Sequence, residues 1–181
     1  MVVVSGSNAQ HVAEQLAQSM GWSHVKLEAR RFPDSEGYIR IPEDGIEAIR
    51  SEPVVVVSNT FPDAGIVETM LILKAVSDVR KGSMENLRGI EPQKMEDIGP
   101  GVYLAVPYFG YSRQDKRFKP GEVISARAIA DMLAGQCDGL AVLDLHAPKV
   151  LENLSVPVAF TSAMPELASH LQREVNPDFI L

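Results

Sequence analysis

The sequence predicts an α/β protein with a mainly parallel β-sheet flanked by helices. Short valine-rich apolar runs alternate along the chain with amphipathic stretches. This alternation is typical of folds in which a helix joins each strand to the next. Four consecutive valines at positions 54–57 favour a strand buried on both faces, as strands of parallel sheets are. The length of 181 residues is enough for one full-sized domain with a sizeable core.

The first half of the chain contains four of the predicted strands and two of the predicted helices. Residues 2–4 form a short apolar run, and apolar residues then recur at helical spacing from Ala9 to Met20. Ser7 or Asn8 is the expected N-cap of this helix, and Gly21 its expected end. Further strands are expected at 24–28, 38–41 and 54–57, and a second helix over 66–76.

The second half repeats the pattern after an interruption. Residues 82–101 are polar with two prolines, which favours an exposed insertion, with a subunit contact or a lid as the alternative. Strands are then expected at 102–106 and 140–143, with a helix over 124–133 between them. A short helix, a Val-Pro-Val strand at 156–158, a helix over 164–173 and an apolar run at 179–181 complete the sequence.

Composition limits the class of protein. The formal net charge of −7 argues against a nucleic-acid binder, which would usually be basic. Cys137 is the one cysteine, so no disulfide can form within the chain, which fits a reducing compartment; a structural role is favoured for it. The N-terminus lacks the basic region of a signal peptide, and no apolar run approaches the roughly 20 residues that span a bilayer. We therefore expect a soluble cytoplasmic protein with no membrane partner.

The segment at 107–122 is the most informative stretch for function. Ligands of parallel α/β sheets bind beyond the carboxyl ends of strands, which directs attention to the loops after Val4, Val57, Val106 and Leu143. The loop after Val106 contains four cations within seven residues, namely Arg113, Lys116, Arg117 and Lys119. Arginine forks match phosphate oxygens, so this loop suits a polyphosphate or nucleotide. A solvated charged loop is the alternative.

Two smaller groups of residues also suggest chemistry. Asp144 and His146 close a buried-looking strand, where a carboxylate can contact a Mg²⁺ held mainly by phosphates and water, although a structural histidine is the alternative. In the loop around Phe32, Asp34 and Glu36, an adenine could stack on the ring and donate its amino hydrogens to a carboxylate. A plain acidic turn is the alternative there.

Four motifs, in order, resemble the ribose-phosphate pyrophosphokinase family (phosphoribosyl pyrophosphate synthetases). They are SGSNAQHVAEQLA, RFPDSEGYIRI, VPYFGYSRQDKRFKPGEVISARAIADML and LDLHAPKV, and together they run through nearly the whole chain. The resemblance implies two similar α/β domains of the type I phosphoribosyltransferase kind, assembled into dimers or larger oligomers. It also implies transfer of the β,γ-pyrophosphoryl group of ATP to the C1 hydroxyl of ribose 5-phosphate, with Mg²⁺, to supply nucleotide biosynthesis.

The resemblance assigns expected roles to single residues. It implies that an adenine is held by the loop of a neighbouring subunit, through Phe32, Asp34, Ser35 and Glu36. Ser35 stands where the family usually has glycine, so a positive φ would be costlier here. Arg113 and Gln114 would contact the phosphates or sugar of ATP, and Asp115 and Lys116 belong to the same motif. His146, with Asp144 beside it, would belong to the Mg²⁺–ATP site.

The resemblance also implies what residues 1–181 lack. They correspond to the N-terminal ATP-binding and oligomerisation domain, without the C-terminal ribose 5-phosphate-binding domain and its catalytic Lys/Arg loop, expected beyond Leu181. The sequence contains no [DE]-[DE]-x-x-x-T-G-G pattern, and Ser155 and Ala159 stand near where some relatives have carboxylates. We therefore expect this chain alone to bind Mg²⁺–ATP weakly at best and to carry out no measurable synthesis. A non-catalytic, synthetase-associated regulatory subunit is the main alternative, and a phosphoribosyltransferase would need the phosphate loop that is missing.

Overall fold

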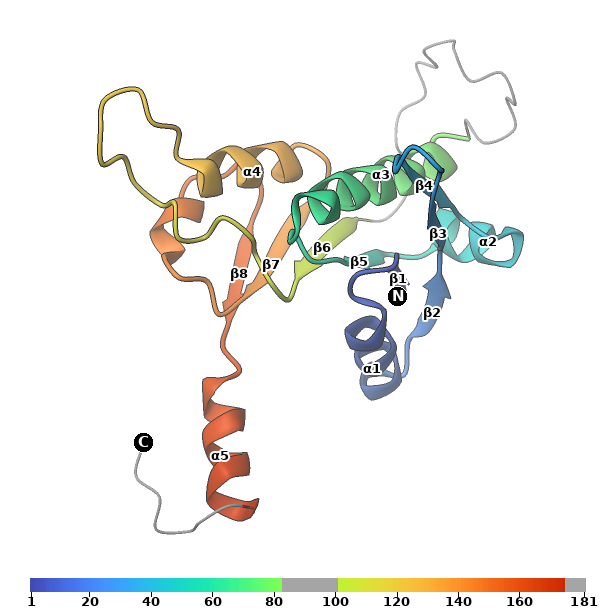
Figure 1. Cartoon of the computed structure of the whole chain (residues 1–181). Helices are drawn as coiled ribbons and strands as arrows, with labels where there is room; N and C mark the ends of the chain where they lie inside the picture. The colour runs from blue at the N-terminus through green and yellow to red at the C-terminus, as the bar shows by residue number, and fades with distance from the viewer. Residues whose placement is uncertain (83–100, 175–181) are drawn as a thin grey trace.

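A six-stranded parallel sheet forms the centre of the computed structural model, which describes residues 1–82 and 101–174 (Figure 1). The strand order is β2-β1-β5-β6-β7-β8, and each neighbouring pair is parallel. The strands are β1 (Val2–Ser5), β2 (Ser23–Lys26), β5 (Val54–Val57), β6 (Val102–Val106), β7 (Gly139–Leu143) and β8 (Val158–Thr161). The predicted α/β class with a parallel sheet is confirmed. The predictions for positions 83–100 and 179–181 lie outside the described residues.

Helices cover both faces of the sheet. On one face, α1 (Gln10–Met20) packs its small residues Ala13 and Ala17, together with Ala9 just before the helix, against Val3 and Val57. The other face is covered by α2 (Glu43–Ser51), α3 (Asp63–Arg80) and α4 (Ser125–Ala134), as Figure 1 shows for α3 and α4. The sheet is therefore enclosed where its valine-rich strands require burial on two sides.

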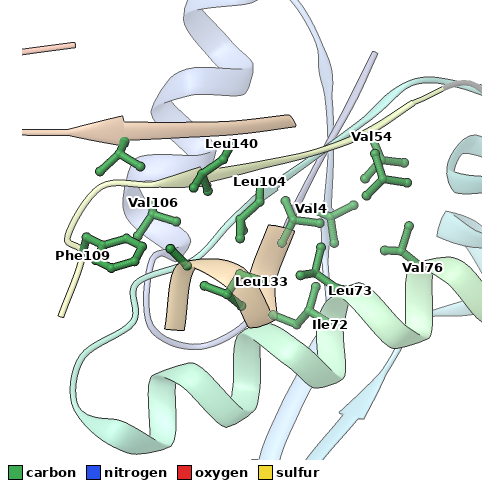
Figure 2. Close-up of a cluster of buried hydrophobic side chains, with 14 of the residues drawn as sticks. Val4, Val54, Ile72, Leu73, Val76, Leu104, Val106, Phe109, Leu133 and Leu140 are labelled. Atoms are coloured by element: carbon green, nitrogen blue, oxygen red, sulfur yellow. The ribbon is translucent and has the colours of Figure 1, made fainter. Parts of the chain in front are cut away.

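The main core lies between the sheet and helices α2, α3 and α4. Alternate residues of the central strands point into it, and Figure 2 shows Val4, Val54, Leu104 and Leu140 facing α3 and α4. The helices contribute fully buried side chains, among them Ile49, Ile72, Leu73 and Leu133. Burying each such side chain stabilises the fold by about 1.5–3 kcal/mol relative to leaving it exposed.

A hairpin stands apart from the main sheet. It consists of β3 (Glu28–Arg31) and β4 (Gly37–Arg40), paired antiparallel, and β4 contacts α3. The sequence predicts a single strand over 24–28. The structure instead ends β2 at Lys26 and begins β3 at Glu28, with Leu27 buried between them.

The last described elements are η2 (Pro148–Leu151), a 3-10 helix, and α5 (Met164–Glu174). No residue of α5 is buried, and the helix projects away from the sheet in Figure 1. Strand β8 begins at Val158, so the predicted strand at 156–158 is wrong except for its last residue. Among the described residues, no helix combines the length and apolar character needed to cross a bilayer. The cytoplasmic location stays a prediction.

Two other local predictions differ from the structure. Helix α2 was not predicted, because Gly45 and the preceding Pro42 look like a turn. The N-cap of α1 is Ala9, with no side-chain cap, so the prediction of Ser7 or Asn8 is wrong. Gly21 ends α1 in the left-handed conformation, as predicted.

Candidate functional site

Because the strands are all parallel, their carboxyl ends lie along the same end of the sheet. The chain runs from β1 outward to β2 and later returns to place β5 on the other side of β1. The point where the strand order reverses lies between β1 and β5, and such points are where ligands of open α/β sheets bind. The loops after β1, β5 and β6 are joined there by hydrogen bonds.

Asn8 and Asn59 connect the loops after β1 and β5 through their side-chain amides. Asn8 Oδ1 accepts from the Asn59 N–H at 3.0 Å and from Ser58 Oγ at 3.2 Å, and Asn8 Nδ2 donates to the Asn59 carbonyl at 3.1 Å. Asn59 Nδ2 returns a bond to the Asn8 carbonyl at 2.9 Å. Because both side chains are half-buried, these bonds satisfy groups that water would otherwise have to solvate.

The start of the segment after β6 is attached to the same frame. Asn59 Oδ1 accepts from the Tyr108 N–H at 2.9 Å, and Thr60 Oγ1 accepts from the Gly110 N–H at 2.7 Å. The two backbones are so close that a Cβ at Gly110 would lie 2.4 Å from the Thr60 carbonyl oxygen. Only glycine fits this approach, so residues 107–110 hold a fixed position on the loop after β5.

The cationic turn, which we define as residues 111–119, follows directly and is mostly exposed. Arg117 Nε donates to the Glu122 carbonyl at 2.7 Å, and the Lys116 ammonium lies 5.1 Å from the centre of the Phe118 ring. Arg113 has no hydrogen-bond or ion-pair partner within the described part of the chain. Its guanidinium is therefore available to an anion.

The position of the cationic turn is set by bonds at its far end. Glu122 Oε2 accepts from the N–H groups of Phe118 and Lys119, at 2.7 and 3.1 Å. Gln114 accepts a hydrogen bond from the Ser125 hydroxyl, and its carbonyl accepts from the Ala126 N–H at 3.4 Å. Gln114 thus ties the turn to the beginning of α4, while its neighbours in the motif, Asp115 and Lys116, stay at the surface.

The hairpin loop carries the predicted adenine-binding residues on a different part of the molecule. Figure 1 shows the hairpin on the α2 side of the sheet, opposite the segment between β6 and α4. Ser35 has a φ of 75°, and Asp34 Oδ1 accepts from the Glu36 N–H at 3.1 Å. The left-handed conformation at Ser35, anticipated from the family's glycine, is present in the structure.

The aromatic side chains of the hairpin form a small exposed group with an arginine. Phe32 is 40% exposed and meets Tyr38 edge to face, with ring centres 5.7 Å apart. The Arg30 guanidinium lies 4.1 Å from the centre of the Tyr38 ring and 4.9 Å from that of Phe32. A planar cation and an open ring surface are both suited to stacking on a nucleobase.

A cavity of about 640 Å³ lies between the hairpin and α3. Its walls include Arg31 and Glu36 from the hairpin loop and Val67, Glu68 and Leu71 from α3. The Glu68 carboxylate closes one end, accepting from the N–H and the hydroxyl of Ser7 at 2.6 Å each. None of its lining residues comes from 107–122, so the cavity is separate from the cationic turn.

Asp144 and His146 follow β7 at the same strand-end edge. Asp144 has a φ of 46°, and its carboxylate accepts from Ser162 Oγ at 2.5 Å and from the Ala163 N–H at 3.1 Å. These bonds fix the chain between β8 and α5, a structural role that the sequence did not indicate. His146 is exposed.

Asp144 can offer a single carboxylate to a Mg²⁺ ion. Within residues 1–82 and 101–174, no group of three or more His, Cys, Asp or Glu side chains could hold a metal. Asp144 still has lone pairs on both oxygens, since each accepts only one described bond. One carboxylate fits a Mg²⁺ that is held mainly by phosphate oxygens and water.

Two titratable side chains outside the site have shifted pKa values. Burial lowers the pKa of His24, whose Nε2 lies 2.8 Å from Ser5 Oγ. Burial also raises the pKa of the Cys137 thiol, and the Cys137 Sγ donates to the Leu133 carbonyl at 3.5 Å. A neutral, half-buried thiol favours the structural role expected for Cys137.

The structure groups the predicted site residues into three separate places. Arg113, Gln114, Asp115 and Lys116 lie together; Phe32, Asp34, Ser35 and Glu36 lie on the hairpin; and Asp144 and His146 lie after β7. No hydrogen bond or ion pair between described residues joins one place to another. Asn8, Asn59 and Thr60 were not among the predicted site residues. The rule that ligands bind at strand ends could have identified all three, since each follows a valine-rich strand by a few residues.

Comparison with known proteins gives consistent matches. Residues 1–136 match the family model described as the N-terminal domain of ribose phosphate pyrophosphokinase. The chain is 34% identical over 182 residues to the ribose-phosphate pyrophosphokinase of Methanothermobacter thermautotrophicus, covering 99% of this chain and 56% of that protein. It is 30% identical over 184 residues to the same-named protein of Sulfurisphaera tokodaii, covering 100% of this chain and 56% of that protein. The chain thus spans about half the length of these curated relatives.

A solved structure agrees on the fold. The phosphoribosylpyrophosphate synthetase of Mycobacterium smegmatis superposes with a TM-score of 0.69 at 21% identity, covering 96% of this chain and 52% of that one. At this identity the match supports the phosphoribosyltransferase-like fold and nothing finer.

Proposed function

We infer the function from one premise: this chain belongs to the ribose-phosphate pyrophosphokinase family. We propose that it supplies the ATP-binding half of an enzyme that transfers pyrophosphate from ATP to C1 of ribose 5-phosphate. The product is phosphoribosyl pyrophosphate, a precursor for nucleotide biosynthesis. The proposal assigns residues 1–181 the role of an N-terminal domain, and the ribose 5-phosphate site to a second domain outside them.

The main support for the proposal is that hydrogen bonds attach the cationic turn to the loop after β5 and to the start of α4. Arg113 and Lys116 present charges to solvent from a turn attached to both β5 and α4. Phosphoryl-type transfer is catalysed mainly by positioning and by cations that spread charge over the phosphate oxygens. A preorganised arginine meets that requirement without a covalent enzyme intermediate.

The adenine site would be completed by a second copy of the chain. Phe32, Asp34 and Glu36 lie on the hairpin, separate from the cationic turn of the same chain. We propose that the hairpin of one subunit holds the adenine whose phosphates lie on the cationic turn of its neighbour. A homo-oligomer would then be necessary for complete ATP binding.

Mg²⁺ would enter the site with ATP. Asp144, with His146 beside it, would hold the ion from the protein side, and the ion would offset the negative charge of the phosphates when bound. The protein's own contribution is to orient the polyphosphate through Arg113 and Gln114.

Calorimetry and a synthesis assay test the proposal. Titration of the purified 181-residue chain with Mg²⁺–ATP should give saturable binding, whereas ribose 5-phosphate alone should give none. Mixing all substrates should give no phosphoribosyl pyrophosphate, because the sequence lacks the acidic, Thr-Gly-Gly loop expected to hold ribose 5-phosphate. Absence of ATP binding would remove the nucleotide role, and robust synthesis would overturn the division between two domains.

A non-catalytic regulatory subunit is the second candidate. The observation that favours it is that Asp144 fixes the start of α5, a structural role that a non-catalytic subunit would need as well. A regulator would capture a catalytic synthetase tightly and would not depend on Arg113. A pull-down with a purified family synthetase, run beside the ATP titration, separates the two functions.

A further inference from the structure

We propose that Tyr111 and Asp63 are positioning residues that set the orientation of Arg113 for a bound polyphosphate. The inference rests on the proposed function for the identity of the ligand. Its structural part concerns only how the cationic turn is held. Neither residue was among the predicted site residues.

Tyr111 lies at the boundary between the fixed and the exposed parts of the segment after β6. Residues 107–110 are attached to the loop after β5, with Gly110 as the last fixed residue. Tyr111 then adopts a φ of 62°, in the left-handed region that a residue with a Cβ rarely occupies. A non-glycine residue stays in this conformation only when its surroundings hold it there.

The hydroxyl of Tyr111 supplies such a restraint. It donates to Asp63 Oδ1 at 2.7 Å, across 48 positions of sequence. Asp63 lies in the first turn of α3, where the helix dipole favours a carboxylate. The bond and the negative charge of Asp63 raise the pKa of Tyr111, in keeping with a hydroxyl that donates to the carboxylate.

The restraint reaches Arg113 through the backbone. The Gln114 N–H donates to the Tyr111 carbonyl at 2.9 Å, which closes a four-residue turn with Arg113 as its third residue. Gln114, at the end of this turn, is tied to α4 through Ser125 and Ala126. Arg113 thus lies between two anchors, the Tyr111–Asp63 bond on α3 and the Gln114 bonds on α4.

The bond also affects the electrostatic repulsion between Asp63 and a bound polyphosphate. An unpaired carboxylate at the edge of the cationic turn would repel phosphate oxygens. Because the Tyr111 hydroxyl donates to it, one oxygen of the carboxylate faces a hydrogen-bond donor within the protein, which weakens its repulsion of phosphate oxygens. The pair therefore has two separable effects, orientation of the turn and weaker repulsion from Asp63.

Four variants separate these effects in a Mg²⁺–ATP titration. Tyr111→Phe removes the bond and leaves the Asp63 carboxylate unpaired, so it should weaken binding about three- to tenfold. Asp63→Ala removes the bond and the negative charge together, so it should weaken binding by a smaller factor. The double variant should bind Mg²⁺–ATP no more weakly than the single variant with the lower affinity, because both substitutions delete the same hydrogen bond. Asp63→Asn keeps an amide oxygen that can accept the bond, so it should restore most of the affinity lost in Asp63→Ala.

The matched control is Tyr103→Phe. Tyr103 is 41% exposed on β6, compared with 42% for Tyr111, and its hydroxyl has no hydrogen bond to any described residue. This variant should bind as the unmodified chain does. Wild-type affinity in Tyr111→Phe, or losses that simply add in the double variant, would overturn the inference.

Limited trypsin digestion provides a readout that needs no nucleotide. Cleavage after Arg113 and Lys116, followed by mass spectrometry, should be roughly threefold or more faster in Tyr111→Phe and Asp63→Ala, because the turn loses one anchor. Tyr103→Phe should be cut at the wild-type rate. If the unmodified chain binds no ATP, the proposed function fails, and the digestion alone tests whether the Tyr111–Asp63 bond holds the cationic turn. Faster cleavage of the variants would support that role, and unchanged cleavage would overturn it.

Discussion

The loop after β5 and the cationic turn before α4 lie at the same edge of the sheet and use their polar groups in opposite ways. In the first, the Asn59 amide bonds to Asn8 on one side and to Tyr108 on the other. In the second, Arg113 points to solvent with no partner among the described residues. The contrast separates side chains that hold strand ends together from a side chain left free for a ligand.

The contrast predicts that the two regions respond differently to substitution. Removing an internally satisfied amide should lower the stability of the fold. Removing an exposed arginine should lower ligand affinity and leave stability unchanged.

Asn8→Ala should have the largest effect, which is a loss of stability. This change deletes three side-chain hydrogen bonds and leaves the Asn59 N–H without its acceptor. The free energy of unfolding should fall by about 2–3 kcal/mol, because a half-buried donor loses its partner. Urea unfolding measures this loss in the free energy of unfolding. Gln15→Ala, an exposed amide on α1, is the control, and equal losses in the two variants would contradict the assigned role of Asn8.

Arg113→Ala tests the other region. The affinity for Mg²⁺–ATP should fall about tenfold, equivalent to ~1.4 kcal/mol, because a charged fork to phosphate is lost. The melting temperature should stay unchanged, and calorimetry measures the binding. Arg50→Ala, an exposed arginine on α2, is the control. Unchanged affinity, together with tight capture of a synthetase, would favour the regulatory function.

A substitution in the hairpin loop should have a smaller effect, and it should raise the stability of the fold where Asn8→Ala lowers it. Ser35→Gly should raise the free energy of unfolding by about 0.5–1 kcal/mol, because the φ of 75° strains serine and not glycine. Thermal unfolding measures the shift. The control, Ser169→Gly in α5, should lower stability, since glycine is unfavourable within a helix. A loss of stability in Ser35→Gly would show that the loop relieves the strain in another way.

The smallest effect concerns pH. The folded-state pKa of His24 is lowered from 6.5, so the unfolded chain binds more protons as the pH falls through 6.5. Stability should therefore be fully present above this value and decline below it, until His24 is also protonated in the folded state. His24→Gln should flatten the decline in urea unfolding between pH 7 and 5. An identical slope in both proteins would exclude His24 as its source.

Much of the fold could be predicted because the strands have strong local signals. Four consecutive valines and the run at 102–106 fix β5 and β6 without reference to the rest of the chain. The alternation of strands and helices then leaves a parallel sheet as the simplest arrangement. The cationic turn was also visible, because four cations in seven residues stand out in any context.

What the sequence did not show depends on contacts between distant residues. Asn8 has the chemistry of an N-cap, but its side chain bonds to Ser58 and Asn59, about 50 positions away. The metal role of Asp144 stays a prediction, and its hydrogen bonds with Ser162 Oγ and the Ala163 N–H are contacts that the sequence did not show. Helix α2 was hidden because Gly45 resembles a turn residue, although in the structure it lies buried against Val25.

The turn after β1 has a consequence for how this sequence can vary. A Cβ at Gly6 would lie 2.3 Å from Glu68 Oε1 and 2.8 Å from Ile72 Cδ1, so any side chain at position 6 would displace both, including the carboxylate that accepts two bonds from Ser7. Position 6 is therefore coupled to positions 68 and 72 in a mutant library. Randomising position 6 alone should favour glycine, whereas alanine or serine should be recovered more often when positions 68 and 72 also carry shorter side chains. The three positions should be treated as one unit when the protein is redesigned.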